Sequence, residues 1–339
     1  MNKINIAING FGRIGRAFAK LALNESSLKI VAINDLGTVE NLVYLFKRDT
    51  VYGNFEGEIK IISENKVKIN DQEILFLQEK EPIKLPWKDL NVDLVVEATG
   101  VFEDYNLAYN HIKAGAKKVI ITAPAKGEEG KEGRIVLLGV NEKEAENYKV
   151  ISNGSCTTNA VSPVLKVLSE TIGIKKAILN TVHAYTATQS LVDGQVKGKD
   201  LLRGRAASQN IVPSTTGAAI SVSKAIKELE GKFDGLAIRV PVICGSLADI
   251  TFLSAKETTK EEINQILKEA SQSEKWKNIL GVSEEPLVSS DIIQDQRPSI
   301  VDVTFTKVVD KDLVKVLIWY DNEWGYAWSL IEQIKRIKL

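Results

Sequence analysis

Short apolar runs separated by amphipathic or polar segments organise the first 125 residues of the chain. The runs at 4–8, 29–35, 92–100 and 117–125 have the length and the β-branched content of buried strands. The segment 105–116, between the last two runs, has helical spacing. Strands that alternate with helices predict a parallel sheet wound by right-handed crossovers.

The second half of the chain contains apolar runs without a helix between each pair, which favours a mostly antiparallel sheet covered by helices. Residues 258–272 have the spacing of one such helix, and residues 323–339 are amphipathic as well. Because chain ends often lie close together, we expect the last segment to fold back against the first domain. The predicted strands lie within 175–187, 233–242, 246–256, 299–309 and 313–326.

Three glycines follow the first apolar run in the pattern G-x-G-x-x-G, at Gly10, Gly12 and Gly15. Such glycines allow a tight turn, a close approach of the backbone to a pyrophosphate, and close packing of helix on strand. Asp35 ends the next apolar run, where a carboxylate can accept hydrogen bonds from ribose hydroxyls. A glycine-rich turn is the alternative for the glycines alone, but the strand, the helix and the acid together predict a dinucleotide site. Neighbouring predicted strands end at Thr99, Gly100 and Thr122. We expect these residues to line the same cleft, and the alternative is that they are ordinary loop residues.

The composition argues against several classes of partner. Lys+Arg and Asp+Glu both number 44, so the charge gives no reason to expect nucleic acid or an anionic membrane as partner. No apolar run approaches the roughly 18 residues of a membrane span, and the first residues lack the pattern of a signal peptide. Two cysteines without CxxC or HExxH spacing predict neither a disulfide framework nor a metal site. We therefore expect a reduced, cytoplasmic protein.

One of the two cysteines, Cys156, lies in the polar run SNGSCTTN. This run joins a predicted strand to a predicted helix, so we expect Cys156 at a helix N-terminus, where backbone N–H groups lower the pKa of a thiol. Of the two histidines, His183 lies amid β-branched and hydroxyl residues, whereas we expect His111 to be solvated on a surface helix. A cysteine and a histidine on different elements are the usual plan of an activated nucleophile. An inert thiol and a core histidine are the alternative, and Cys244, in an apolar run, is expected to be inert.

A length of 339 residues is too great for one ordinary core, so we predict two domains. The fold class is predicted to be α/β, a Rossmann-type dinucleotide-binding domain joined to an α+β catalytic domain with a mostly antiparallel sheet. The first domain spans residues 1–153, with the C-terminal helix 322–339 packed back on it, and the catalytic domain spans residues 154–321.

Six motifs follow one another over nearly the whole chain: INGFGRIGR, SNGSCTTN, HAYTATQ, NIVPSTTGAA, RVPV and WYDNEWGY. Together they resemble those of the phosphorylating, NAD-dependent, glycolytic glyceraldehyde-3-phosphate dehydrogenase family. The resemblance implies that Cys156 attacks the aldehyde of D-glyceraldehyde 3-phosphate, and that His183 takes the proton of the hemithioacetal. Oxidation with NAD then leaves a thioester, which inorganic phosphate attacks to release 1,3-bisphosphoglycerate.

The same resemblance implies which residues hold the phosphates and the cofactor. Arginine suits phosphate because its planar guanidinium can donate two hydrogen bonds to one phosphate. The alternative role is turn formation for the hydroxyl residues and a surface ion pair for the arginines. The implied substrate and phosphate ligands are Ser155, Thr157, Thr186, Arg203, Thr216, Gly217 and Arg239. The implied NAD ligands, besides the three glycines, are Arg13, Ile14, Asp35, Lys80, Thr122 and Asn322.

Two alternative functions stay open at this stage. An erythrose-4-phosphate dehydrogenase shares fold and nucleophile but lacks the Tyr-Thr pair present here at Tyr185 and Thr186. A non-catalytic NAD-binding or redox-sensing relative would be expected to have lost Cys156 or His183, and this chain has both. The expected partners are small molecules and inorganic phosphate, with no nucleic acid and no membrane, and the resemblance implies a homotetramer.

The coenzyme preference rests on residues with opposite effects. Asp35 would repel the 2′-phosphate of NADP, and Leu36 after it offers no hydroxyl to such a phosphate. Gln195 replaces a proline usual in the family, and its amide could donate to a phosphate without adding charge. We therefore expect NAD to be preferred, with weak use of NADP.

Overall fold

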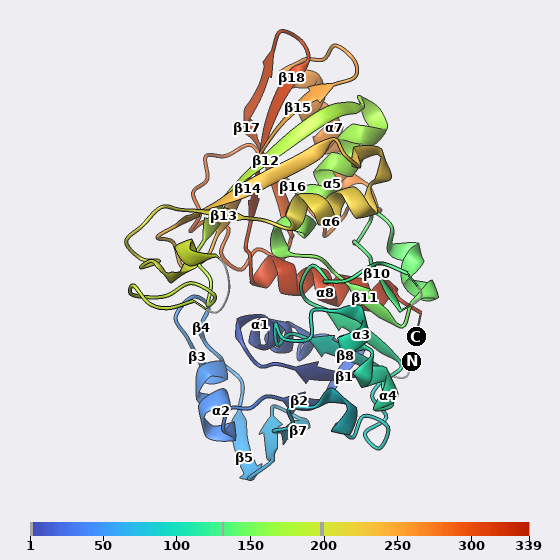
Figure 1. The fold of residues 1–339 in the computed structure, drawn as a ribbon, viewed down its shortest axis with the longest axis vertical. Coiled ribbons are helices and arrows are strands. Elements are labelled where there is room, and N and C mark those ends of the chain that lie inside the picture. Colours follow the sequence, from blue (N-terminus) through green and yellow to red (C-terminus); the bar gives the residue numbers. More distant parts are fainter. Residues whose placement is uncertain (1–2, 131, 197–199, 339) are drawn as a thin grey trace. The chain divides into compact units, whose positions relative to one another are not determined.

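The computed structural model describes residues 3–130, 132–196 and 200–338 of the chain. These residues form two compact units, each built on its own sheet (Figure 1). Across the described ranges, no helix is both long enough and apolar enough to cross a membrane.

The two units interleave along the chain. Unit 1 comprises the described residues up to Val136, Asn141–Gly154, and those from Leu330 onward. Unit 2 comprises Leu137–Val140 and Ser155–Ser329.

Unit 1 is built on a nine-stranded sheet in the order β10-β11-β9-β8-β1-β2-β7-β6-β5. All pairings from β10 to β7 are parallel, which confirms the predicted parallel sheet. From β1 the chain builds first toward β7 and then toward β10, so the strand order reverses between β1 and β8. Ligands of such sheets bind at this reversal, beyond the carboxyl ends of the strands. The parallel strands are β1 (Ile4–Asn9), β2 (Leu28–Asn34), β7 (Gln72–Leu77), β8 (Leu94–Glu97), β9 (Lys118–Ile121), β10 (Gly133–Ile135) and β11 (Val150–Ser152).

The far edge of this sheet is antiparallel, and the sequence does not predict it. β5 (Ile59–Ser63) and β6 (Lys66–Ile69) extend the sheet beyond β7 by antiparallel pairing. Most residues of β5 are exposed, so its sequence lacks the apolar run of a buried strand. A separate two-stranded ribbon joins β3 (Arg48–Asp49) to β4 (Gly53–Asn54).

Unit 1 contains the helix predicted after the glycine motif, whereas the helix predicted at 105–116 differs and the sequence does not predict α2 (Val39–Lys47). The single helix expected at 105–116 consists of two short helices, α3 (Tyr105–Ala108) and α4 (Asn110–Lys113). Asp104 begins α3 by accepting hydrogen bonds from the N–H groups of the first turn. The other helices of this unit are α1 (Arg13–Ala22), α2 (Val39–Lys47) and the 3₁₀ turns η1 (Pro82–Lys84) and η2 (Glu142–Asn147).

Unit 2 is built on a seven-stranded sheet in the order β13-β14-β12-β15-β18-β17-β16. Its pairings are antiparallel except β12 with β14 and β16 with β17, so the predicted mostly antiparallel sheet is confirmed. The strands are β12 (Ile174–Ala184), β13 (Val212–Thr215), β14 (Phe233–Val240), β15 (Ser246–Ser254), β16 (Leu280–Ser283), β17 (Ser299–Val309) and β18 (Leu313–Tyr320).

A buried apolar cluster joins this sheet to its helices. Val164 and Leu168 from α5 meet Ile250 from β15 and Val316 from β18 in the cluster. The alternation of buried residues along β15 shows that one face of that strand packs on the cluster. The helices are α5 (Cys156–Thr171), α6 (Ala218–Ala225), α7 (Lys260–Gln272), the 3₁₀ turns η3 (Leu201–Gly204) and η4 (Lys227–Leu229), and the start of α8 (Trp324–Arg336).

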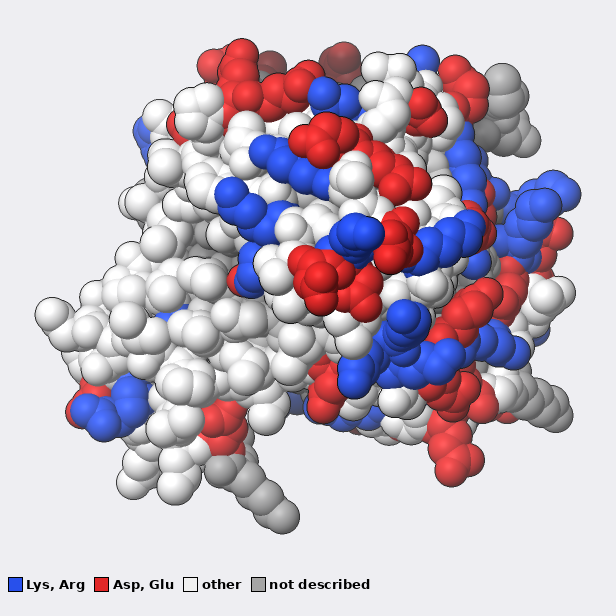
Figure 2. Space-filling model, turned by 90° about the horizontal axis from the view of Figure 1, so that it is seen from above, with Lys and Arg blue, Asp and Glu red and all other residues white. Residues whose placement is uncertain are grey.

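Unit 2 also exposes large apolar side chains. Leu191, Leu201 and Ile211 are each more than 70% exposed in the segment between β12 and β13. On the strands, Ile178 of β12 and Leu236 of β14 are exposed as well. Figure 2 shows a broad area without charged side chains at the left of its view.

Candidate active site

Cys156 is the first residue of α5, and its neighbours fix the start of that helix. Ser155 is the N-cap: its Oγ accepts a hydrogen bond from the Thr158 N–H at 3.1 Å. In return, Thr158 Oγ1 accepts from the Ser155 N–H at 3.1 Å. This reciprocal capping box satisfies donors of the first turn. The thiol therefore lies at a helix N-terminus, where the sequence predicts it.

The thiol of Cys156 faces the imidazole of His183. The distance between Sγ and Nε2 is 3.3 Å, which is within hydrogen-bonding reach for sulfur. His183 lies near the end of β12 and is buried, whereas Cys156 is half-buried. The two predicted catalytic residues thus come together within unit 2, one from a helix and one from a strand.

Arg239 sets the electrostatic environment of His183. β14 runs parallel to β12, and the register places Arg239 directly beside His183. Arg239 Nη1 lies 2.5 Å from His183 Nδ1 and donates to the Ala184 carbonyl at 3.1 Å. Burial, reinforced by the positive charge of Arg239, lowers the pKa of His183 to about 3. His183 is therefore a neutral imidazole near pH 7.

Nδ1 of His183 has two close partners, which make opposite demands on the ring. The Ala184 carbonyl oxygen, 2.7 Å away, only accepts and requires the ring proton on Nδ1, whereas Arg239 Nη1, 2.5 Å away, only donates and requires a lone pair there. In the tautomer with the proton on Nδ1, Nε2 presents its lone pair to the thiol of Cys156 and can accept the thiol proton.

The expected lowering of the thiol pKa is not found. Burial raises the pKa of Cys156, although the charge of Arg239 and hydrogen bonds from Thr157 oppose this effect. The sequence-based expectation failed because it counted the helix N-terminus and not the cost of moving a thiolate out of water. The resting pair therefore consists of a thiol and a neutral imidazole.

Two of the predicted phosphate ligands, Thr186 and Arg203, are joined by a residue that the sequence analysis missed. Thr188 Oγ1 lies 3.0 Å from Thr186 Oγ1 and accepts from Arg203 Nη1 at 2.7 Å. Arg203 also donates to Ser214 Oγ at 3.3 Å and pairs with Asp200 at 2.9 Å. Thr188 belongs to the motif HAYTATQ, together with His183 and Thr186, and this position in the motif could have identified it as a site residue.

The remaining predicted phosphate ligands occupy helix starts. Thr216 Oγ1 accepts from the Ala218 N–H at 3.2 Å, and Gly217 is the N-cap of α6. The side-chain oxygens of Ser155 and Thr157 are already engaged, the first in the cap of α5 and the second with Tyr320. Anions bind well at helix N-termini because the backbone N–H groups there are unpaired.

Tyr320 is a second residue that the sequence analysis missed. Its hydroxyl lies 2.9 Å from Thr157 Oγ1 and 2.7 Å from Thr181 Oγ1, and the ring packs edge-on against His183 with centroids 5.9 Å apart. Burial raises the pKa of Tyr320, so the hydroxyl stays protonated. The ring and the two threonines thereby restrict the space that His183 and the first turn of α5 can occupy.

Asn322 is held by contacts within unit 2. Its Oδ1 accepts from the Gly245 N–H and from Ser246 Oγ, both at 3.0 Å. Ser246 Oγ in turn accepts from the Ala184 N–H at 3.1 Å, next to His183. With Oδ1 fixed in this way, Nδ2 of the amide is turned to the other side, where it can donate.

Unit 1 contains a cavity of about 490 Å³ at the carboxyl ends of its central strands. The turn after β1 approaches the turn after β8 closely: a Cβ on Gly10 would lie 2.6 Å from the Ala98 carbonyl carbon, and Gly10 has φ +95°. Gly12 has open space around its Cα, as close contact with a ligand requires. These residues therefore fit a dinucleotide. The cavity is lined by Asn9, Gly10, Gly12, Asn34, Asp35, Leu36, Glu79, Lys80, Ala98, Thr99, Val101 and Phe102.

Asp35 is clamped at the rim of this cavity. Its Oδ2 accepts from the Phe11 N–H at 2.7 Å, and its Oδ1 accepts from the Gly37 N–H at 2.9 Å. Because both oxygens are held by backbone groups, the carboxylate cannot turn away without losing two hydrogen bonds. Leu36 beside it is exposed.

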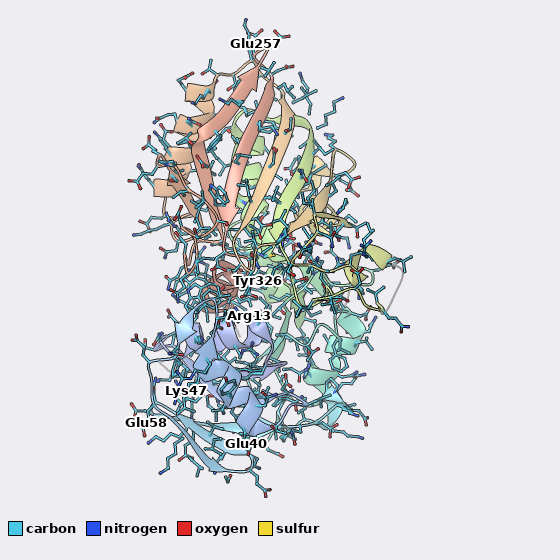
Figure 3. All side chains as sticks on the ribbon, turned by 90° about the vertical axis from the view of Figure 1, so that its left-hand side faces the viewer. Arg13, Glu40, Lys47, Glu58, Glu257 and Tyr326 are labelled. Atoms are coloured by element: carbon cyan, nitrogen blue, oxygen red, sulfur yellow. The ribbon has the colours of Figure 1, made fainter. Side chains whose placement is uncertain are left out.

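The other predicted cofactor residues have mixed surroundings. Arg13 begins α1 (Figure 3), where it pairs with Asp49 at 2.8 Å and lies over the ring of Tyr52. Thr122 Oγ1 donates to the Glu97 carbonyl at 3.0 Å. Neighbouring positions that the sequence also predicts are half-buried Ile14, buried Gly15 and exposed Gly100, which has φ +69°.

The prediction that His111 is solvated is wrong. Its side chain is 0% exposed and contacts Trp87 and Glu97 through its two ring nitrogens. The sequence suggested a surface helix because polar residues surround His111 in the chain, whereas its partners come from distant segments.

Cys244 is buried, as its apolar run suggests. Its Sγ donates to Asp321 Oδ1 at 3.2 Å. The neighbouring carboxylate disfavours a second negative charge on this sulfur. Its surroundings therefore differ from those of Cys156, which faces an imidazole.

A dinucleotide-binding sheet and a Cys–His pair define a class of enzyme: a dehydrogenase that oxidises an aldehyde through a cysteine. Residues 4–105 match the family model described as glyceraldehyde 3-phosphate dehydrogenase, NAD binding domain. Residues 155–322 match the model described as the C-terminal domain of the same enzyme. The chain belongs to the glyceraldehyde-3-phosphate dehydrogenase family, which confirms the predicted fold class and NAD as cofactor.

Similar proteins from three organisms cover nearly the whole chain. The chain is 43% identical to "Glyceraldehyde-3-phosphate dehydrogenase 1" of Kluyveromyces lactis over 335 residues, which is 98% of this chain and 99% of the relative. It is 45% identical to the enzyme of Zymomonas mobilis over 332 residues, 97% of each chain. It is 42% identical to "Glyceraldehyde-3-phosphate dehydrogenase 2" of Bacillus subtilis over 337 residues, 99% and 97% of the two chains. The predicted dehydrogenase activity is supported, and nothing in these matches favours the erythrose-4-phosphate or the non-catalytic alternative.

Proposed function

We propose that this chain catalyses the phosphorylating oxidation of D-glyceraldehyde 3-phosphate to 1,3-bisphosphoglycerate, with Cys156 as nucleophile and His183 as base. The observation that carries the assignment is the 3.3 Å approach of Cys156 Sγ to His183 Nε2. We assign NAD binding to residues 1–153 together with the C-terminal segment 322–339, and the chemistry to residues 154–321. The compact units have other bounds, since Leu137–Val140 and the residues up to Ser329 belong to the second unit.

The chain's own groups perform the proton and acyl transfers. As Sγ of Cys156 bonds to the aldehyde carbon, Nε2 of His183 accepts the thiol proton and then passes it to the former carbonyl oxygen, which gives a hemithioacetal and a neutral imidazole. His183 then accepts the hydroxyl proton of the hemithioacetal during oxidation. NAD, when bound, supplies the two-electron acceptor for this oxidation. The product is a thioester on Cys156, which inorganic phosphate attacks to expel the thiolate and form the acyl phosphate.

Two anion positions serve this reaction. Arg239 and Thr186 hold the phosphate of the substrate, with Arg203 as a further ligand. Ser155, Thr157, Thr216 and Gly217 hold the attacking inorganic phosphate through N–H and O–H donors. The proposal is supported by the link from Thr186 through Thr188 to Arg203, and by the two helix starts at Ser155 and Gly217. When Arg239 binds a phosphate, its charge is neutralised, and its effect on His183 weakens.

The proposed cofactor ligands are residues around the cavity of unit 1, together with Asn322. Asn322 donates from Nδ2 to the nicotinamide carboxamide. The remaining ligands are Gly10, Gly12, Arg13, Ile14, Gly15, Asp35, Lys80, Thr99, Gly100 and Thr122. The clamped carboxylate of Asp35 favours NAD over NADP.

The assembly is proposed to be a cytoplasmic homotetramer. The exposed apolar side chains of unit 2, such as Leu201 and Ile211, support contact with further copies of the chain. The expected partners are otherwise small molecules and inorganic phosphate, with no nucleic acid, no membrane and no metal.

The test is NADH formation by purified protein with D-glyceraldehyde 3-phosphate and NAD, measured by absorbance with and without inorganic phosphate. We expect sustained turnover only with phosphate, and none in Cys156→Ser. Sustained turnover without phosphate, or a preference for erythrose 4-phosphate, would reject the proposal.

A further inference from the structure

Beneath the cofactor cavity of unit 1 lies a buried polar network that the proposed chemistry does not use. We define the Glu97 network as Glu97, His111, Trp87, Asn9 and Thr99. Glu97 is only 2% exposed, and His111 and Trp87 are fully buried. Burying such polar groups costs free energy unless all of them are hydrogen-bonded. Their presence in the interior therefore suggests that they have a function.

The hydrogen bonds of His111 determine which ring nitrogen carries the proton. Trp87 Nε1 lies 2.9 Å from His111 Nδ1, and an indole N–H can only donate. Nδ1 is therefore the acceptor, and the proton of the neutral ring is on Nε2. That proton points at Glu97 Oε2, 2.9 Å away. The indole thus orients the imidazole so that it donates to the carboxylate.

Glu97 connects this buried pair to the turn that lines the cavity. Its Oε1 accepts from the Thr99 N–H at 2.9 Å and from the Thr99 hydroxyl. Its Oε2 also accepts from Asn9 Nδ2 at 2.5 Å. Both Thr99 and Asn9 line the cavity, one after β8 and one at the end of β1. The carboxylate therefore ties together the two strand ends between which the sheet order reverses.

The same turn lies against the first glycine of the dinucleotide motif. A Cβ on Gly10 would lie 2.6 Å from Thr99 N, so any shift of the 98–100 turn changes the space available to the Gly10 turn. Phe102, another cavity residue, packs edge-on against the ring of His111, with centroids 6.5 Å apart. A movement of His111 is thus transmitted to both walls of the cavity.

We propose that Glu97 and His111, oriented by Trp87, are positioning residues for NAD: they hold the Thr99 turn and Asn9 at the spacing that the dinucleotide requires. Both residues belong to unit 1, whereas the Cys156–His183 pair belongs to unit 2. Their loss is therefore expected to weaken the cofactor site and to spare the thiol chemistry. The inference rests on the proposed cofactor site in unit 1.

The test compares His111→Phe, which keeps an aromatic ring but removes both ring nitrogens, with Val119→Ala. Val119 is fully buried in the apolar cluster beside this network, and its truncation removes packing without removing a polar contact. NAD dissociation constants are measured by calorimetry, together with melting temperature and the rate at which iodoacetamide alkylates Cys156 without NAD. Glu97→Gln, which has the same shape, is the second variant in case His111→Phe does not fold.

We expect His111→Phe and Glu97→Gln to weaken NAD binding by about tenfold, the equivalent of losing one hydrogen bond to a charged group. Val119→Ala should lower the melting temperature with NAD affinity nearly unchanged, and alkylation should match the wild type in all variants. His111→Gln, which restores a donor and an acceptor, should recover part of the affinity. Equal NAD affinity in His111→Phe, Glu97→Gln and wild type would overturn the inference. Failure of the wild type to bind NAD would instead reject the proposed cofactor site.

Discussion

Arg239 Nη1 lies 2.5 Å from Nδ1 of His183, on the neighbouring parallel strand. This contact places a guanidinium against the imidazole that we propose as the base for Cys156. Burial and, second to it, the charge of Arg239 lower the pKa of His183, so the ring is neutral before the substrate arrives.

The first prediction concerns the pH dependence of stability. Because burial and Arg239 lower the pKa of His183 from 6.5 to about 3, the unfolded chain binds a proton below pH 6.5 that the folded chain does not. Stability is therefore lost as pH falls through this window, by about 1.4 kcal/mol per pH unit and roughly 2 kcal/mol at pH 5. His183→Asn should show a correspondingly weaker decline in urea unfolding between pH 7 and about pH 4. Equal pH slopes in the two proteins would contradict the lowered pKa.

The second prediction concerns the nucleophile. Iodoacetamide should inactivate the enzyme with one equivalent bound at Cys156, while Cys244, buried and bonded to Asp321, should stay unlabelled. Because burial raises the pKa of Cys156, the alkylation rate should keep rising with pH through the ordinary thiol range. Peptide mapping and the rate against pH provide the measurement. Rapid labelling of Cys244 with activity retained would sink the assignment, and a rate already constant at neutral pH would contradict the raised thiol pKa.

The third prediction concerns oxidation. Cys156 is more accessible than the buried Cys244, and His183 Nε2 lies 3.3 Å from its sulfur, where it can take the thiol proton. Peroxide should therefore convert Cys156 to a sulfenic acid, reversibly with added thiol at low dose and faster as the pH rises. Ala160 stands one helical turn after Cys156, so no nearby thiol on α5 can trap the oxidised sulfur as a disulfide. Mass spectrometry should detect the oxidised Cys156. A Cys156–Cys244 bridge as the main product would be inconsistent with this account.

The fourth prediction concerns the coenzyme. Like charges about 4 Å apart repel by roughly 4 kcal/mol at an effective dielectric near 20, and the clamp on Asp35 prevents the carboxylate from avoiding a 2′-phosphate. NAD should therefore be strongly preferred, and Asp35→Asn should raise kcat/KM for NADP relative to NAD by up to about a thousandfold, the equivalent of that repulsion. Gln195→Pro serves as the second variant, and it should reduce NADP use while leaving NAD kinetics nearly unchanged. A wild-type kcat/KM for NADP equal to that for NAD would show that Asp35 does not decide the preference.

The features that the sequence predicts well are local ones. The strand, the glycine turn, the helix and Asp35 follow one another in the chain, and the polar run around Cys156 contains its own helix cap. Hydrophobic periodicity and turn chemistry act over a few residues, so a single sequence is enough to predict them.

Long-range pairing determines what the sequence does not predict. Arg239 reaches His183 through the register of two parallel strands, 56 residues apart in the chain. Tyr320 meets Thr157 across 163 residues, and Trp87 meets His111 across 24. The pKa of His183 and the burial of His111 depend on such long-range contacts. Local sequence patterns could therefore predict neither.

The most direct test of the central claim is a single-turnover reaction without phosphate. Protein is mixed with D-glyceraldehyde 3-phosphate and NAD, the NADH formed per chain is measured, and the protein is digested for mass spectrometry. The account predicts a burst of at most one NADH per chain and a phosphoglyceroyl adduct on Cys156, which added phosphate discharges. Full turnover without phosphate, or an adduct on any residue other than Cys156, would contradict it.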